Sequence, residues 1–281
     1  TTFTATTPST SFNIPITAFT GTDNTGVTGY KITQSSTPPL AGDAGWTDPA
    51  PAIYMVGLDG SYTLYPWVKD AAGNVSAVFP TPRTVTVDTT APAVSSTIPT
   101  NGAASVALNS SVTINWSENV NCSTVNTTNI TSDSPGWTFS TCSTNQAVFT
   151  TSAQANSTTY NINVSTAVTD TNGNPMTAAY PFSYTTESAP DTESPILTAF
   201  TATSPSTNLN IPIPSFTATD NVAVTGYKIT ESATPPLAGD AGWTGTAPAT
   251  YTVASDGTYT LYPWVKDAAG NVSAVFPTPR T

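Results

Sequence analysis

The stretch YPWVKDAAGNVSAVFPTPRT occurs twice in the chain, at residues 65–84 and again at residues 262–281. The two copies belong to a longer repeat, because residues 3–84 align with residues 200–281 without a gap. A shorter stretch at residues 170–174, DTNGN, has the same Asp-x-x-Gly-Asn skeleton. Asp, Gly and Asn favour turns, so each copy predicts a loop between two strands.

These copies predict three domains, at residues 1–89, 90–189 and 190–281, of which the first and third are repeats of each other. The two joins share the pattern Asp-Thr-x-x-Pro, as VDTTAP at residues 87–92 and PDTESP at residues 190–195. Proline restricts the backbone of such a short connector. We therefore expect neighbouring domains to be joined end to end.

The fold class expected from the composition is all-β. Charged residues make up only 8% of the chain, and Thr, Val and Tyr, which favour strands, are frequent. Residues 61–69 and 77–87 of the first domain and 112–116 of the middle domain have strand patterns. About seven short strands punctuated by Gly, Pro and Asn are typical of a two-sheet β-sandwich.

Two stretches of the third domain carry a family resemblance, ATDNVAVTGY at residues 218–227 and WVKDAAGNVS at residues 264–273. Through them the outer domains resemble the bacterial Ig-like and fibronectin-type-III-like repeats of large secreted or cell-surface proteins of the adhesin and S-layer type. The middle domain resembles the bacterial Ig-like module of envelope proteins, through Ser117-Glu118, residues 158–164 and residues 168–175. The resemblance implies three tandem Ig-like or fibronectin-like sandwiches in an extracellular or cell-surface protein.

Charge and composition argue against several functions. The formal net charge of −11 repels phosphate backbones and anionic lipids, so we expect neither nucleic-acid binding nor membrane insertion. No apolar run approaches the ~20 residues of a membrane-spanning helix, and no signal peptide is present, so we expect a mature or excised piece. The chain has no His, no Gly-x-Ser-x-Gly motif and no phosphate-binding loop. We therefore expect no enzymatic activity, no catalytic residues and no organic cofactor.

Acidic residues at the predicted domain joins suggest calcium sites. In a sandwich of the immunoglobulin type, the incoming linker, the loop between strands B and C and the loop between strands F and G lie at one pole. Clustered carboxylate and amide oxygens in flexible loops are ligands that Ca²⁺ accepts. The candidate ligands are Asp191, Glu193, Asp220, Asn221, Asp267 and Asn271 in the third domain, Asp88, Glu118, Asp170 and Asn174 in the middle domain, and Asp23 and Asp70 in the first.

The same residues have a second interpretation that needs no ion. Asp and Asn can cap turns by bonding to their own backbone, while Gly supplies the positive φ that a tight turn requires. This explains Asp-x-x-Gly-Asn as a purely local structure. Lys69 and Lys266 stand next to the aspartates in the sequence and count slightly against a metal, although strand alternation should direct their side chains to another face. The sequence leaves both interpretations open.

The only two cysteines, Cys122 and Cys142, lie in the middle domain. An oxidising compartment favours a disulfide between them, whereas two buried free thiols are the alternative. We predict the disulfide, because the other features are those of an extracellular protein.

The third domain is expected to lack its last strand. In the first domain the repeat continues into VTVD at residues 85–88, an alternating final strand, whereas the copy in the third domain stops at Thr281. The sequence is therefore either a window on a longer alternating array or a domain whose strand is supplied by another subunit at an open sheet edge.

The function expected from these features is structural: a stalk, an adhesin shaft or a surface fibre subunit of a bacterial extracellular protein. Its partners would be neighbouring copies or adjacent repeats, and also a cell-surface or polysaccharide ligand. The alternative is an accessory carbohydrate-binding tandem of a secreted polysaccharide hydrolase. For that role a sugar-stacking platform would need the aromatic residues Trp46, Trp67, Trp243, Trp264, Tyr54 and Tyr65. Aromatic residues on sandwich strands usually fill the core, and we expect these to do so.

Overall fold

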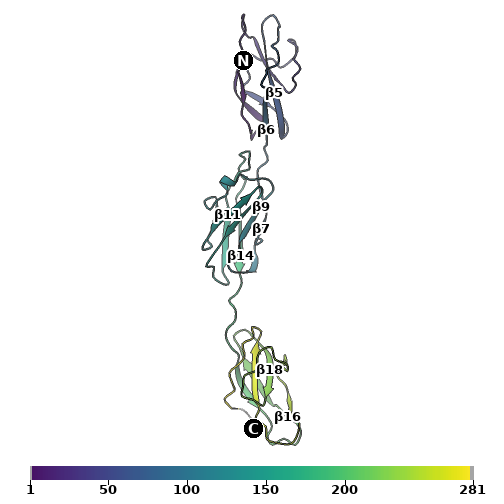
Figure 1. Ribbon diagram of the computed structural model, residues 1–281, viewed down its shortest axis with the longest axis vertical. Coiled ribbons are helices and arrows are strands. Elements are labelled where there is room, and N and C mark those ends of the chain that lie inside the picture. The colour runs from purple at the N-terminus through teal and green to yellow at the C-terminus, as the bar shows by residue number, and fades with distance from the viewer. Residues whose placement is uncertain (1, 279–281) are drawn as a thin grey trace. The chain divides into compact units, whose positions relative to one another are not determined.

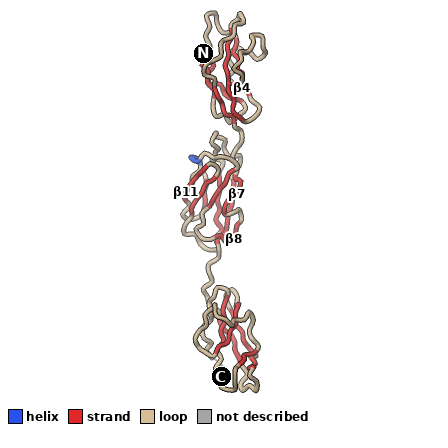
Figure 2. The backbone as a smooth tube through the Cα atoms, turned by 45° about the vertical axis from the view of Figure 1, so that its right-hand side comes forward, coloured by secondary structure: helices blue, strands red, loops and turns tan. Residues whose placement is uncertain are grey.

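The computed structural model describes residues 2–278, so residue 1 of the first predicted domain and residues 279–281 of the third lie outside the described residues. The chain divides into two compact units, Thr1–Ser188 and Ala189–Thr281. Strands and loops make up nearly all of the described chain, and the helical part is the short 3-10 helix η1, Cys122–Thr124 (Figure 1, Figure 2). The predicted all-β fold is confirmed.

The N-terminal segment, residues 2–87, is built from two three-stranded sheets. One sheet has the order β1 (Thr2–Ala5), β2 (Asn13–Thr20) and β4 (Ile53–Met55), and the other has the order β3 (Gly29–Thr33), β5 (Gly60–Lys69) and β6 (Arg83–Val87). All pairings are antiparallel. Alternation along β6 buries Val85 and Val87 and leaves Thr84 and Thr86 exposed, so this strand closes the core with its two valines.

The predicted closing strand at residues 77–87 was too long, because the observed strand β6 starts only at Arg83. Residues 77–82 are irregular and contain Pro80 and Pro82. Proline has no N–H group to donate to a sheet, so this part of the chain is unsuited to a strand that pairs on both sides.

The middle segment, residues 88–186, has two four-stranded sheets that enclose one core. The first has the order β10 (Ile130–Ser132), β13 (Thr159–Val164), β14 (Tyr180–Thr186) and β8 (Ala103–Val106); the second has the order β11 (Thr138–Ser143), β12 (Gln146–Thr150), β9 (Val112–Trp116) and β7 (Val94–Ile98). Strand β8 pairs with β14 in parallel, and the other pairings are antiparallel. The buried residues of β9, Val112, Ile114 and Trp116, alternate along the strand as half-buried sheets require.

The C-terminal segment, residues 189–278, contains three two-stranded sheets. They pair β15 (Ile196–Thr201) with β17 (Ser215–Thr219), β16 (Asn210–Pro212) with β19 (Thr250–Thr252), and β18 (Val224–Thr230) with β20 (Tyr262–Asp267). Strands β16 and β17 correspond to the single strand β2 of the N-terminal segment. The interruption coincides with Pro214, which stands where the first copy has Thr17 and which removes a backbone donor.

Most of the buried hydrophobic residues belong to three clusters, one in each segment. The tryptophans Trp67, Trp116 and Trp264 are almost fully buried in the three segments. The prediction of three separate domains at residues 1–89, 90–189 and 190–281 stays a prediction. Across residues 2–278, no helix is both long and apolar enough to cross a membrane.

Candidate metal centres

The Asp-x-x-Gly-Asn loop of the middle segment is organised by the carboxylate of Asp170. Its Oδ1 atom accepts hydrogen bonds from the backbone N–H groups of Asn172 (2.8 Å), Gly173 (2.6 Å) and Asn174 (2.8 Å). The Asn174 side-chain amide donates to Oδ2 of Asp170 at 2.8 Å. Gly173 has φ +100°, a conformation that strongly favours glycine. The loop therefore has the self-capped turn of the ion-free interpretation.

The same loop recurs in the two copies of the repeat. In the C-terminal segment, Oδ1 of Asp267 accepts from the backbone of Gly270 (2.7 Å) and Asn271 (2.8 Å), and the Asn271 side chain donates to Oδ2 at 2.6 Å. In the N-terminal segment, Asp70 accepts from the backbone of Asn74 at 2.8 Å and from its side chain at 2.7 Å. Three sequence copies therefore give one local structure.

In two of the loops, these hydrogen bonds favour the ionised form of the aspartate, Asp70 or Asp267. The pKa of Asp70 is lowered, mainly by the side-chain and backbone hydrogen bonds from Asn74. Burial of Asp267 works in the opposite direction, but the hydrogen bonds from Asn271 and Gly270 outweigh it and its pKa is also lowered. A carboxylate held ionised in this way is ready to interact with a cation.

The loops also hold the linkers. The Asn174 side chain donates to the backbone carbonyl of Asp88 at 2.9 Å, and the Asn172 side chain donates to Oδ2 of Asp88 at 2.6 Å. In the C-terminal segment, the Asn271 side chain donates to the carbonyl of Asp191 at 3.1 Å. Each linker aspartate is thus fastened to the Asp-x-x-Gly-Asn loop of the segment that follows it.

One cluster of three acidic groups forms in the middle segment. Carboxylate oxygens of Asp88, Glu118 and Asp170 lie within 4.8 Å of one another. Asp170 is 1% exposed, and Oε1 of Glu118 is buried without a hydrogen-bond partner. The pKa of Glu118 is raised by burial first and then by the negative charges of Asp88, Asp170 and Asp59. This cluster therefore contains an uncompensated negative charge.

The C-terminal segment contains the equivalent cluster. Carboxylate oxygens of Asp191, Asp220 and Asp267 lie within 4.8 Å of one another, and Asp267 is 2% exposed. Oδ2 of Asp191 and Oδ1 of Asp220 are buried and without hydrogen-bond partners. The other oxygen of Asp220 accepts from the backbone of Val222 (3.0 Å) and Ala223 (2.9 Å), which fixes the carboxylate in place.

The remaining candidate ligands lie around these clusters or apart from them. Asn174 and Asn271 use their amide groups to hold the clusters, and Asn221 donates to Oδ1 of Asp191 at 3.1 Å. Glu193 is exposed and donates its backbone N–H to Asp191 at 3.1 Å. Its carboxylate is not part of the three-acid cluster.

The N-terminal segment has a less complete arrangement. Asp23 accepts from the backbone and side chain of Thr25, at 2.9 and 2.8 Å, and these bonds lower its pKa. Asp23 also raises the pKa of Asp70 slightly through its charge, against the larger effect of Asn74. Within residues 2–278, no third acidic group joins these two.

Each cluster combines three carboxylates and contains at least one buried oxygen without a hydrogen-bond partner, an arrangement that suits a hard divalent cation. Ca²⁺ is bound by oxygen ligands in flexible loops, with carboxylates supplying the compensating charge. Unpaired carboxylates this close repel one another, and a bound cation removes that repulsion. Among the described residues, no Lys or Arg makes an ion pair with an acid of either cluster. The donor set therefore fits Ca²⁺, with additional oxygen ligands from water or backbone.

The lysines beside the motif turn away from the acids. Lys69 donates to the carbonyl of Ala41 at 2.8 Å and lies 5.2 Å from the Trp46 ring centroid. A side chain at Gly29 would come within 2.9 Å of Lys69, so the glycine makes room for this contact. Lys266 lies in the same way 5.2 Å from Trp243. The prediction that alternation directs these lysines to another face is confirmed.

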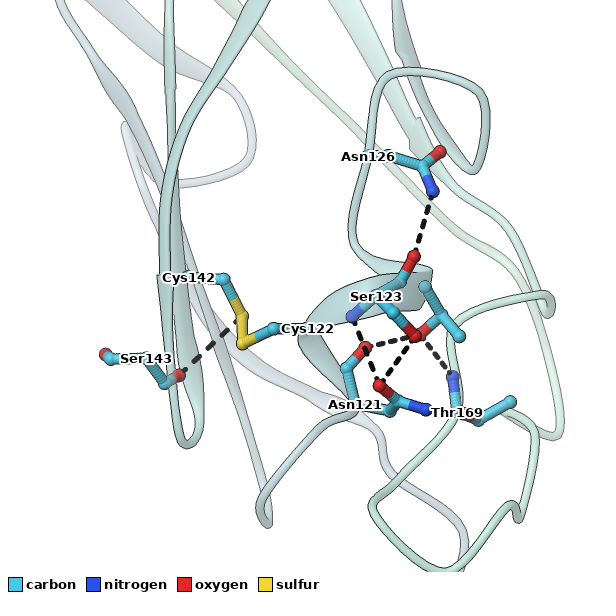
Figure 3. The surroundings of a disulfide bond; sticks show 8 residues. Asn121, Cys122, Ser123, Asn126, Cys142, Ser143 and Thr169 are labelled. Atoms are coloured by element: carbon cyan, nitrogen blue, oxygen red, sulfur yellow. Dashed lines mark hydrogen bonds between the residues drawn. A yellow bond between two sulfur atoms is a disulfide. The ribbon is translucent and has the colours of Figure 1, made fainter.

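A disulfide joins Cys122 in η1 to Cys142 in β11 (Figure 3). The backbone of Asn121, which precedes η1, donates to the carbonyl of Thr169 at 2.8 Å, and Thr169 N–H donates to Oγ1 of Thr124 at 3.1 Å. Thr169 directly precedes Asp170. The disulfide therefore tethers the loop that lies against one side of the middle acidic cluster.

Sequence reasoning missed two residues that hold the first linker. Asn172 occupies a variable position of the motif, and its bond to Asp88 depends on the folded loop. Asp59 accepts from the backbone and hydroxyl of Thr89 and from the hydroxyl of Thr90, at 2.9, 3.0 and 3.1 Å. No sequence signal distinguishes this aspartate from an ordinary turn residue.

The expectation that all six candidate aromatics fill the core was wrong in part. Trp67 and Trp264 are completely buried, but Trp46 and Trp243 lie half-buried in long loops. The indole of Trp46 donates to the carbonyl of Leu40 at 3.0 Å. Tyr54 in β4 and Tyr65 in β5 are also half-buried.

Comparison with known proteins gives one family. No curated protein matches the chain. The family model of the bacterial Ig-like domain matches residues 88–186, a range that begins at the linker aspartate Asp88 and includes Glu118 and Asp170. The two four-stranded sheets around one core agree with this match. The middle segment is thus similar to bacterial Ig-like domains, as its sequence resemblance predicted.

Proposed function

We propose that this chain is a non-catalytic structural segment of a bacterial extracellular protein, in which Ca²⁺ fastens each linker to the domain that follows. In this role it serves as a stalk, an adhesin shaft or a surface fibre subunit. The match of residues 88–186 to the bacterial Ig-like domain supports the structural part of the proposal, because such domains occur in surface proteins and are typically non-catalytic.

The observation that carries the proposal is the recurrence of one arrangement at both linkers. Asp88 and Asp191 each bring a carboxylate into a cluster with a buried loop aspartate, Asp170 or Asp267. Each also has its backbone carbonyl bound by the loop asparagine. A cation in such a cluster binds the linker and two loops at once, and so restricts how the linker leaves the domain.

Calcium titration by calorimetry tests the two proposed sites. We expect about two ions per chain, and Glu118→Gln and Asp220→Asn should each remove one site while leaving the other. Asp48→Asn is the matched control, because Asp48 is exposed and belongs to neither cluster. Equal calcium binding by all four proteins would refute the calcium proposal.

Small-angle scattering tests the mechanical consequence. With calcium, we expect a narrower distribution of the molecule's overall dimensions than with a chelator. The circular dichroism signal of the strands should be the same in both conditions. Glu118→Gln should respond less to the chelator than Asp48→Asn does. Identical scattering with and without chelator would contradict a stiffening role.

Carbohydrate binding is less favoured by the contacts of the loop tryptophans. Lys31 and Lys69 lie 5.8 and 5.2 Å from the Trp46 ring centroid, and the contacts at Trp243 are equivalent. Both rings are thus engaged within the protein. Retention on insoluble polysaccharide that is lost in Trp46→Ala would favour the carbohydrate-binding alternative over a structural segment.

A further inference from the structure

The two linker aspartates stand at different distances from the strand that precedes them. Strand β6 ends at Val87, so the first linker aspartate, Asp88, follows it directly. Strand β14 ends at Thr186, and residues 187–190 separate it from the second linker aspartate, Asp191. The two joins therefore differ in the length of chain between the last strand of one segment and the aspartate that binds to the next.

At the first join, Asp88 bonds to the segments on both sides. Its N–H donates to the carbonyl of Ser9 at 3.0 Å, in the segment that precedes it. In the segment that follows, the Asn174 side chain donates to the carbonyl of Asp88 at 2.9 Å, and the Asn172 side chain donates to its Oδ2 at 2.6 Å. Only the torsions of Asp88 itself thus separate its bonds to the two segments.

The carboxylate of Asp59 adds a second attachment to the preceding segment. Asp59 lies in the turn before β5 and accepts from the backbone and the hydroxyl of Thr89, at 2.9 and 3.0 Å. Its other oxygen accepts from the hydroxyl of Thr90 at 3.1 Å. Both threonines come after Asp88 in the chain, so the preceding segment still holds the linker beyond the point at which the following segment has bound it. Because these attachments overlap, bending the first join breaks several hydrogen bonds at once.

The attachments at the second join do not overlap. The middle segment holds Glu187, whose N–H donates to the carbonyl of Val106 at 2.8 Å. The C-terminal segment holds Asp191, whose carbonyl accepts from the Asn271 side chain at 3.1 Å. Between them, residues 188–190 are exposed and have no hydrogen-bond partner within the described part of the chain. The second join therefore contains three residues that neither segment holds.

This free stretch has few torsions that can turn. The proline ring fixes φ of Pro190, and Ala189, which precedes the proline, is restricted to extended conformations. Most of the remaining freedom lies at Ser188 and in ψ of Pro190. Three residues reach at most about 10 Å, so the stretch can act as a short hinge and not as a long tether. The boundary between the two compact units falls in the same stretch, after Ser188.

We propose that the two joins are mechanically different: the first is a fixed joint closed by Asp59, and the second is a hinge at residues 188–190. The N-terminal and middle segments then move as one body, and the C-terminal segment moves separately. A cation bound by Asp191 does not lock the hinge, because the free residues precede Asp191 in the chain. The difference between the joins therefore does not depend on calcium.

Residual dipolar couplings of the full 281-residue chain test this difference. Segments that move together share one alignment tensor, whereas a segment beyond a hinge has a tensor of its own. We expect residues 2–87 and 94–186 to fit a single tensor and residues 196–278 to need a second one, in chelator and in millimolar calcium alike. One tensor for all three segments in either condition, or three separate tensors, would overturn the proposal.

The variant Asp59→Ala tests the fixed joint. It removes the three hydrogen bonds to Thr89 and Thr90, and the N-terminal and middle segments should lose their common tensor. Asp256→Ala is the matched control, because Asp256 is the counterpart of Asp59 in the other copy of the repeat and bonds to neither join within the described residues. The control should keep the common tensor. A folded Asp59→Ala protein with the common tensor intact would overturn the role of Asp59.

A second variant transfers the free stretch to the first join and does not depend on how well Asp59→Ala folds. Inserting Ser-Ala-Pro between Val87 and Asp88 leaves β6 intact but separates Asp88 from the bond to Ser9. We expect the N-terminal and middle segments to need separate tensors in this protein, as the segments on either side of residues 188–190 do in the wild type. A common tensor after the insertion would overturn the assignment of residues 188–190 as a hinge.

Discussion

Replacing Glu118 by Gln is expected to change the stability of the middle segment in opposite directions with and without calcium. Carboxylate oxygens of Glu118, Asp88 and Asp170 lie within 4.8 Å of one another. At this distance two unit charges repel by about 0.9 kcal/mol in water and by about 3.5 kcal/mol at an effective dielectric constant of ~20. The substitution removes two of the three repulsive pairs. Because solvent screens partly exposed groups, we expect a gain of about 1–2 kcal/mol in the free energy of unfolding without metal.

Calcium should reverse the order of the two proteins. An ion that binds only the folded state at a concentration 100 times its Kd adds about 2.7 kcal/mol to the stability of the wild-type protein. The variant retains two of the three carboxylates and should gain much less. Differential scanning calorimetry in chelator and in millimolar calcium measures both effects. For a domain of this size, 1 kcal/mol corresponds to a shift of about 4–8 °C.

The pH dependence of the metal-free protein gives an independent check. Burial and three neighbouring acids raise the pKa of Glu118 in the folded state above its ordinary value of 4.5. The ionised group therefore destabilises the fold at neutral pH, and this penalty is relieved as the pH falls through the raised pKa. The stability advantage of Glu118→Gln should accordingly shrink as the pH is lowered from 7. A variant that is less stable than the wild type by the same amount in chelator and in calcium would refute the electrostatic reasoning.

Two further predictions concern the disulfide and a buried loop aspartate. Reduction of the Cys122–Cys142 disulfide should lower the free energy of unfolding of the middle segment by about 3 kcal/mol, and so should replacement of both cysteines by serine. Urea denaturation with and without reductant measures this loss. An unchanged denaturation midpoint would contradict a stabilising disulfide. The pKa of Asp267 is lowered in the folded state, so its ionised form stabilises the C-terminal segment at pH values above its ordinary pKa of 3.8. This contribution is lost as the pH falls through the lower pKa of the folded state. Asp267→Asn should therefore weaken the segment at pH 7 and flatten its acid dependence in calorimetry, and parallel pH curves for the two proteins would count against it.

The fold was predictable because alternation and turn residues are local signals. Residues 112–116 were expected as a strand and form β9, and residues 61–69 form most of β5. Strand β7, with the sequence VSSTI, and β8, with AASV, were not predicted, because short polar strands carry little alternation. They are strands because β9 and β14 pair with them. Tertiary pairing thus decided what local sequence left undetermined.

The candidate site was predictable to a smaller extent. The position of the linker and loop acids in the sequence was sufficient to propose clusters, since sandwich topology brings those loops to one pole. The sequence gives no indication that single oxygens of Glu118, Asp191 and Asp220 are buried without partners. For Asp191 and Asp220, the neighbouring oxygen of the same carboxylate is engaged by an amide or backbone donor, Asn221 or Val222. The buried oxygens that favour a cation therefore depend on how the loops pack, which residue spacing alone does not specify.

The two copies of the repeat show how strongly a partner decides strand structure. Residues 60–64, GSYTL, and residues 257–261, GTYTL, differ only at Ser61 and Thr258. The first stretch is the beginning of the ten-residue strand β5, whereas β20 begins only at Tyr262. Intrinsic propensity does not explain this difference, because Thr favours strands at least as well as Ser. The first stretch pairs with β6, and this pairing holds it as a strand.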